Sequence, residues 1–131
     1  MDRRAVSDWA EAYRVAWETC DDGAAAALFT EDATYRSNIY EEPHRGRDGV
    51  AGYWREVTST QAGVTVQMGT PLVDGDRAVV EFWTTMDNEG TPVTLAGSLL
   101  LDFDDAGSCV ALREYWNFTT GTHSPPAGWG R

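Results

Sequence analysis

The chain has 131 residues, of which 42% are hydrophobic, and a formal net charge of −11 at pH 7. That length is typical of one domain with a core of ordinary size, and the negative charge repels nucleic acid over most of the surface. Because the apolar stretches are short and the N-terminus has no signal-peptide pattern, we expect a cytoplasmic protein that does not enter a membrane.

The first part of the chain has helical periodicity. Apolar side chains recur at spacings of three and four over residues 7–20, which predicts a helix with Ser7 as its N-cap. A short second helix is expected over residues 24–29, with Asp22 as its cap, and residues 30–32 are expected to end it.

A strand and a third helix are expected next. Residues 33–37 read as a strand that places Tyr35 and Ser37 on one face. Residues 38–47 form a polar loop, after which Asp48 can cap a helix with apolar side chains up to Val57.

From residue 64 onward the periodicity becomes that of strands. Four strands are expected, at residues 64–68, 77–86, 93–103 and 110–118. Asp74 and Gly75 predict a turn that pairs the first two strands as a hairpin, and residues 104–107 predict another before the last strand. We expect a single domain with an ordered core of about residues 6–118 and a loose tail over 119–131.

This order of elements predicts the α+β class, with three early helices packed on a late, mostly antiparallel sheet. A strongly curved sheet around three helices leaves a conical cavity, because the helices do not fill the concave side.

The last predicted strand contains an acidic residue between apolar neighbours. Alternation places Leu112, Glu114 and Trp116 on one face of the strand. If that face is the core face, Glu114 is a buried acid with a raised pKa or a paired one, and either state is costly. Glu114 is therefore the best single indication of a functional site.

Four segments carry a family resemblance, namely Leu28–Tyr35, Gly46–Trp54, Asp102–Gly107 and Arg113–Trp116. In this order they resemble the nuclear transport factor 2-like superfamily, especially its SnoaL-like and ketosteroid-isomerase-like branches. The resemblance implies a cone-shaped barrel with a pocket between helices and sheet, commonly dimerised through the outer sheet face. It implies no single activity, because the fold hosts isomerases, cyclases, hydrolases, dehydratases and binding modules.

Comparison with the ketosteroid isomerase pattern gives a mixed result. Tyr13 falls where that family has its oxyanion-stabilising tyrosine, but the general-base aspartate falls on Ser37 and the second oxyanion acid on Leu99. Steroid isomerisation by that mechanism is therefore not expected. SnoaL-like cyclases use an acid on the late strands, a role that Glu114 fills if it faces inward, and the Arg-Asp network of epoxide hydrolases has no evident counterpart.

Two roles for Glu114 stay open. In the first it is a general acid or base that Trp116 desolvates, and Tyr13 hydrogen-bonds either Glu114 or a substrate oxygen. In the second it pairs with an arginine such as Arg36 or Arg55 and closes the floor of the cavity.

The other candidates also have two interpretations. His44 lies near the expected mouth of the cavity, where an imidazole can exchange a proton near neutral pH, or it is simply solvated. The candidate ligand-binding residues are Trp17, Tyr35, Ser37, Trp54, Phe82, Leu99 and Trp116. The alternative for these side chains is a plain core without a pocket.

The expected outer face of the sheet carries apolar side chains. If Phe82 and Leu99 face inward, Trp83 and Tyr115 lie outside with Ala96 and Ser98. That surface is apolar enough to favour a symmetric homodimer.

The sequence thus leaves three functions open. The first is a protein that binds a small hydrophobic molecule and performs cofactor-free acid/base chemistry, such as isomerisation, cyclisation or dehydration. The second is a ligand-binding or accessory protein without catalysis, and the third is a protein-interaction module. No cofactor is expected because the chain lacks a phosphate-binding glycine loop, and no metal because Cys20 and Cys109 stand alone.

Overall fold

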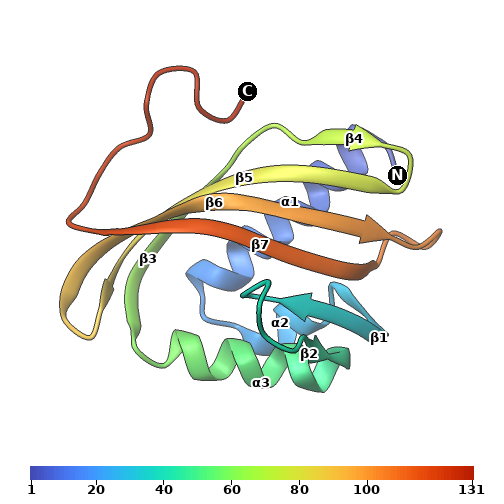
Figure 1. Ribbon diagram of the computed structural model, residues 1–131, viewed down its shortest axis with the longest axis horizontal. Helices are drawn as coiled ribbons and strands as arrows, with labels where there is room; N and C mark the ends of the chain where they lie inside the picture. Colours follow the sequence, from blue (N-terminus) through green and yellow to red (C-terminus); the bar gives the residue numbers. More distant parts are fainter.

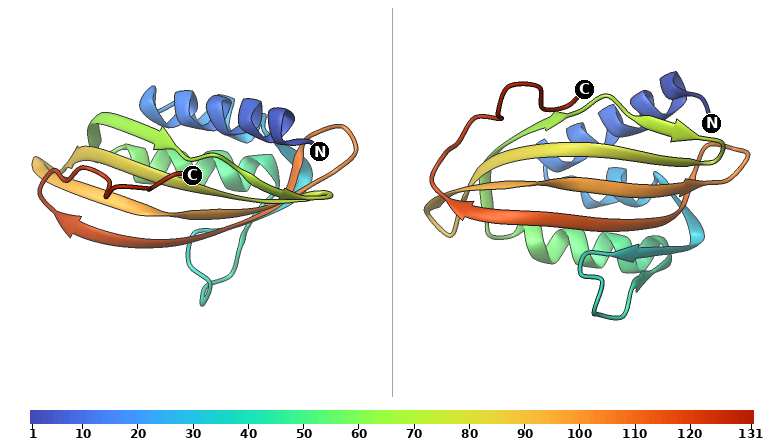
Figure 2. Two further views of the ribbon diagram at one scale, coloured as in Figure 1. Left: turned by 90° about the horizontal axis from the view of Figure 1, so that it is seen from above. Right: turned by 45° about the horizontal axis from the view of Figure 1, so that its top comes forward.

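The computed structural model describes residues 1–131. Its elements, labelled in Figure 1, are α1 (Arg3–Glu18), α2 (Asp22–Ala26), β1 (Phe29–Arg36), β2 (His44–Arg45), α3 (Gly46–Thr58), β3 (Gln61–Met68), β4 (Leu72–Asp74), β5 (Arg77–Asn88), β6 (Thr91–Phe103) and β7 (Cys109–Thr120). All three helices lie on one side of a curved sheet, as the left view of Figure 2 shows. The predicted α+β architecture is confirmed.

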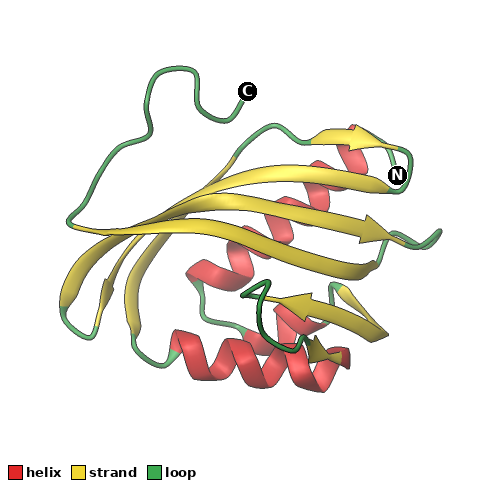
Figure 3. Ribbon diagram, in the orientation of Figure 1, coloured by secondary structure: helices red, strands yellow, loops and turns green.

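The strands form one sheet in the order β2-β1-β7-β6-β5-β3, with β4 paired to the first residues of β5. Every pairing is antiparallel except that of β1 with β7, which is parallel. The three long strands β5, β6 and β7 make the body of the sheet (Figure 3). The parallel pairing places the early strand β1 beside the last strand β7 in one sheet.

The core lies between the helices and the concave face of the sheet. The buried stripe of α1 consists of Val6, Trp9, Ala10, Tyr13, Ala16 and Trp17. Trp9 stacks on Tyr13 with ring centroids 5.4 Å apart and meets Phe29 and Phe103 edge-on. Edge-to-face packing of this kind adds stability beyond the area that the rings bury.

The caps of the first and third helices differ from the prediction. The first helix begins at Arg3, because the Asp2 carboxylate accepts a hydrogen bond from the Ala5 N–H at 2.8 Å, and Ser7 lies inside the helix. The third helix begins at Gly46 without a side-chain cap, so Asp48 lies in its first turn. An acidic residue there still stabilises the helix through the macrodipole.

The second helix is shorter than predicted and the strand after it is longer. Asp21, and not the predicted Asp22, caps a helix that ends at Ala26, and β1 already starts at Phe29. Phe29 is fully buried and pairs with Cys109 of β7. Pairing between distant strands therefore overrides the helical pattern of this segment, and residues 30–32 belong to the sheet.

The predicted pairing of the segments around 64–68 and 77–86 is confirmed, with β3 antiparallel to β5. The segment between them also contributes a short strand, β4, which the sequence analysis left out. Asp74 pairs with Arg77, so Gly75 and Asp76 make the tight turn expected from the Asp-Gly sequence. Gly75 has a φ of +61°, the left-handed conformation that such a turn requires.

The two faces of the sheet are those expected from the alternation. Val80, Phe82 and Thr84 are buried beneath the helices, and so are Leu99 and Leu101 of the neighbouring strand. The outward-facing side chains of β5 to β7 are more exposed. None of the helices is long and apolar enough to cross a membrane.

The C-terminal segment, expected to be loose, lies on the outer face of the sheet. Residues 119 and 120 extend β7, and the His123 N–H donates to Thr94 Oγ1 at 3.0 Å. Trp83 Nε1 donates to the carbonyl oxygen of His123 at 2.9 Å, and the ring of Trp129 packs edge-on against Trp83. Backbone and aromatic contacts that the sequence pattern does not reveal therefore hold this segment.

Candidate functional site

A cavity of about 270 Å³ lies between the helices and the concave face of the sheet. Tyr13 and Trp17 of α1 and Tyr35 of β1 line it together with Glu114 and Trp116 of β7. Helical spacing brings the two α1 residues to one face, and strand alternation does the same for the two β7 residues. Trp54 of α3 lines it too, so the structure brings together six of the predicted site residues around one space.

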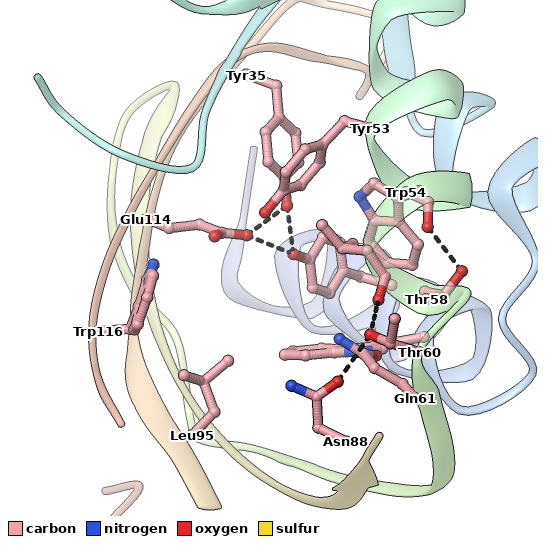
Figure 4. A pocket seen from close by; sticks show the side chains of 13 residues that line it. Tyr35, Tyr53, Trp54, Thr58, Thr60, Gln61, Asn88, Leu95, Glu114 and Trp116 are labelled. Carbon is pink, nitrogen blue, oxygen red and sulfur yellow. Dashed lines mark hydrogen bonds between the residues drawn. The ribbon is translucent and has the colours of Figure 1, made fainter. Parts of the chain in front are cut away.

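Glu114 is held by two tyrosines (Figure 4). Tyr13 Oη donates to Glu114 Oε1 at 3.2 Å, and Tyr35 Oη donates to the same oxygen. The two phenol oxygens lie 3.0 Å apart. Tyr35 reaches the acid because β1 pairs Tyr35 with Leu112, two residues before Glu114 on the same face.

The second carboxyl oxygen of Glu114 is free for a ligand. Both phenols bind Oε1, and no protein group donates to Oε2. The side chain is partly buried and belongs to the cavity wall. The acid is therefore fixed by one oxygen and presents the other without a protein partner.

The surroundings of Glu114 raise its affinity for a proton. Burial raises the pKa of Glu114 to about 7, although the hydrogen bonds from Tyr35 and Tyr13 act in the opposite direction. Burial and the nearby carboxylate raise the pKa of Tyr13 and of Tyr35 well above the ordinary value, so both phenols stay protonated. The carboxyl group can thus exchange a proton near neutral pH while its two donors remain neutral.

The alternative of an arginine partner for Glu114 does not hold. Arg36 donates to the carbonyl oxygen of Glu41 at 2.8 Å, and Arg55 pairs with Asp22 at 2.9 Å. No cation forms a salt bridge with Glu114. Because no counter-ion stabilises the carboxylate, burial can raise the pKa of Glu114.

Aromatic rings serve as cavity wall and as core at the same time. Tyr13 meets Trp54 edge-on with centroids 5.1 Å apart, and Trp17 packs against both rings. Tyr13 and Trp54 are almost fully buried, whereas Trp116 is 46% exposed and donates its Nε1–H to the carbonyl oxygen of Ser37. The pocket is therefore closed on the helix side and open near Trp116.

Four predicted site residues do not line this cavity. His44 belongs to β2 and stacks on Tyr53 with ring centroids 4.3 Å apart. Tyr53 lines the cavity, and His44 does not. Ser37 follows β1 and contributes its carbonyl oxygen to Trp116. The other two, Phe82 and Leu99, are fully buried in the core.

Sequence reasoning missed several residues of the wall. Tyr53, Val57, Thr58, Thr60, Gln61, Asn88 and Leu95 also line the cavity. Tyr53 and Val57 are four residues apart on α3, so helical periodicity could have predicted that they lie on the same face as each other. Gln61 and Asn88 lie at strand ends, where polar residues resemble those of loops, and only their pairing in the sheet brings them to the cavity.

The SnoaL-like domain matches residues 10–112, which covers most of the chain. The chain belongs to the SnoaL-like domain family. In this SnoaL-like domain the matched segment runs from the middle of α1 to the first part of β7, and it ends two residues before Glu114.

Solved structures share the fold of this SnoaL-like domain. A hypothetical protein with a ketosteroid isomerase-like fold from Catenulispora acidiphila, in complex with trimethylamine, gives a TM-score of 0.75 at 20% identity, covering 82% of this chain and 84% of its own. SalBIII, described as epoxide hydrolase/cyclase-like in pyran ring formation of salinomycin, gives 0.79 at 19% identity, covering 92% and 98%. RV0760c from Mycobacterium tuberculosis gives 0.76 at 14% identity, covering 92% and 99%.

At these levels of identity the structural likeness establishes the fold alone. No curated protein matches the chain significantly in sequence. No group of three or more His, Cys, Asp or Glu side chains lies close enough to hold a metal ion.

Proposed function

We propose that this SnoaL-like domain binds a small apolar molecule in its cavity and moves a proton on that molecule with Glu114. The observation that carries the proposal is the environment of the Glu114 carboxyl group. Two phenols donate to its Oε1, and its Oε2 has no protein partner. Burial raises its pKa to about 7. Isomerisation, cyclisation and dehydration all need such a proton transfer and no cofactor.

In this proposal the residues have distinct roles. Glu114 is the catalytic residue, because its free oxygen faces the bound molecule. Tyr13 and Tyr35 are positioning residues that fix the orientation of the carboxyl group. Trp17 and Trp116 supply apolar surface for the ligand. A small molecule in complex with one structural neighbour and the cyclase-like description of another support a small-molecule function.

The test uses a substrate that reports a general base in an apolar pocket. 5-Nitrobenzisoxazole opens by elimination when a base removes its carbon-bound proton, and the nitrophenolate product is followed by absorbance. We expect the wild-type protein at pH 8 to exceed the rate given by an equal concentration of propionate by at least about 100-fold. A rate no higher than that of propionate contradicts a catalytic Glu114 and leaves ligand binding as the function.

That second function, ligand binding without catalysis, is favoured by one specific observation. The positions that correspond to the two isomerase acids hold Ser37 and Leu99, and neither residue lines the cavity. The elimination assay separates the two functions, because a purely binding pocket can hold the compound without removing its proton.

We also propose that the domain forms a homodimer through the outer face of its sheet. Val79 and Tyr115 are 37% and 43% exposed there, which is apolar surface that a second copy can cover. Trp83 is partly covered by the C-terminal segment, so the remaining patch consists mainly of Val79 of β5 and Tyr115 of β7. Light scattering at micromolar concentration is expected to give twice the chain mass of 14.4 kDa, and a monomer would contradict the proposal.

A further inference from the structure

The end of the cavity remote from Glu114 is polar, and proton transfer at Glu114 does not explain it. Thr60, Gln61 and Asn88 line that end, where the start of β3 meets the end of β5 (Figure 4). Gln61 pairs with Asn88 in the sheet, so the two amides are neighbours. Both side chains are half-buried.

The orientation of the Gln61 amide is determined by a tryptophan. Trp17 Nε1 lies 2.9 Å from Gln61 Oε1, and an indole nitrogen can only donate a hydrogen bond. The amide oxygen of Gln61 must therefore face Trp17. Its Nε2, which carries two N–H groups, then donates to no protein group.

Asn88 presents its amide nitrogen in the same way. Thr60 Oγ1 donates to Asn88 Oδ1 at 2.7 Å, and no protein group accepts from Nδ2. Thr60 is itself held close by its carbonyl oxygen, which accepts from the Glu89 N–H at 2.8 Å. Two neighbouring amides thus offer only donors at this end of the cavity.

The two polar ends of the cavity are well separated along the sheet. Asn88 pairs with Thr91 of β6, whereas Glu114 pairs with Leu99 of the same strand. These positions are eight residues apart, at most about 26 Å along a curved strand. Leu95 stands midway and lines the cavity, so the space between the two ends is apolar.

We propose that Gln61 and Asn88 select substrates that carry a hydrogen-bond acceptor oxygen, such as a ketone or ester carbonyl, at the end remote from Glu114. The inference rests on the proposed function, which places the reacting end of the substrate at Glu114. An apolar group at the far end would strip water from two amides without replacing its hydrogen bonds, and this penalty is the basis of the selection. The substrate class is therefore an elongated apolar molecule with an acceptor oxygen at the end remote from Glu114.

The test compares two compounds of nearly equal size and shape. 4-Acetyl-4′-hydroxybiphenyl and 4-ethyl-4′-hydroxybiphenyl share the phenol that Glu114 can bind, and only the first has a carbonyl at the other end. Affinities follow from calorimetric titration. We expect the wild-type protein to bind the ketone about tenfold more tightly than the ethyl compound.

Matched variants assign the preference to the amides. Gln61→Glu keeps an acceptor for Trp17 but replaces the donors by a carboxylate oxygen, and Asn88→Asp does the same opposite Thr60. Each variant is expected to lose the preference for the ketone. Gln67→Glu, which adds the same charge at an exposed position of the same strand, is expected to keep it. Glu114→Gln is expected to change both affinities by the same factor, because both compounds carry the phenol.

The outcomes separate this inference from the proposed function. Equal affinity of the wild-type protein for the two compounds overturns the inference and leaves the role of Glu114 intact. A ketone preference that survives in both amide variants also overturns it, and a lowered melting temperature in those variants would then assign the amides to holding β3 and β5 together. Failure of both compounds to bind at millimolar concentration overturns the proposed pocket and the inference with it.

Discussion

Replacing Glu114 with Gln is expected to lower the rate of 5-nitrobenzisoxazole elimination by about 10²- to 10⁴-fold, the usual contribution of a positioned general base. The amide keeps the size of the side chain and an oxygen that can accept from Tyr13 and Tyr35, so the cavity keeps its shape. It has no basic oxygen that can take a proton. The loss is therefore one of chemistry and not of packing.

The pH dependence of the wild-type rate gives a second measurement of the same prediction. A base acts when it has lost its proton, so the rate should rise tenfold per pH unit below the pKa of Glu114 and level off above about pH 7. A midpoint near the ordinary glutamate value of 4.5 would show that burial does not tune this acid. Glu56→Gln, at an exposed position of α3, is the control and should keep the wild-type rate and midpoint.

Stability should respond to pH in the opposite direction. The folded protein holds the Glu114 proton more tightly than the unfolded chain, because the pKa rises from 4.5 to about 7 on folding. The unfolded chain therefore binds fewer protons between these values, and the free energy of unfolding contributed by this group falls as pH rises through that window. The Gln variant lacks this contribution, and an intact unfolding transition above pH 7 would show that its lost activity is not lost folding.

The position of Glu114 could be predicted from the sequence, because it depends on local periodicity. An alternation of two residues places Leu112, Glu114 and Trp116 on one face whatever the strand pairs with. Helical spacing likewise places Tyr13 on the buried face of α1 with Trp9 and its other apolar neighbours. These patterns, together with the family resemblance, were enough to identify the fold and the central acid.

The partners of Glu114 could not be predicted in the same way. That Tyr35 and not an arginine reaches the acid depends on the parallel pairing of β1 with β7, which joins segments 79 residues apart. The amide pair of Gln61 and Asn88 depends in the same way on the register between β3 and β5. His44 seemed to lie in a loop at the cavity mouth, but two residues of pairing with β1 turn it toward Tyr53. Contacts between distant segments decide all three cases.

A glycine in the middle of the sheet is expected to be the most sensitive position outside the cavity. Gly97 of β6 lies opposite Trp116 of β7, and a Cβ placed on it would clash with the Tyr115 carbonyl oxygen. The same Cβ would approach Trp116 Cα to 2.8 Å. These are main-chain atoms of a paired strand, so the clash cannot be relieved by turning a side chain. Glycine in a strand interior is favoured where two backbones approach this closely.

Gly97→Ala should therefore lower the free energy of unfolding by about 3 kcal/mol, the upper part of the range for overpacked sites. Gly52→Ala is the matched control, since nothing lies within 4 Å of its added Cβ on α3. It should raise stability by about 0.5–1 kcal/mol, because alanine favours a helix over glycine. Urea denaturation of both variants measures the difference.

Gly97→Ala should also affect activity, because Trp116 and Glu114 share one face of β7 and a shift of this strand would displace the carboxyl group. Gly97→Ala is therefore expected to lose elimination activity, whereas Gly52→Ala retains it. Equal stability of the two variants would contradict the close approach of β6 and β7.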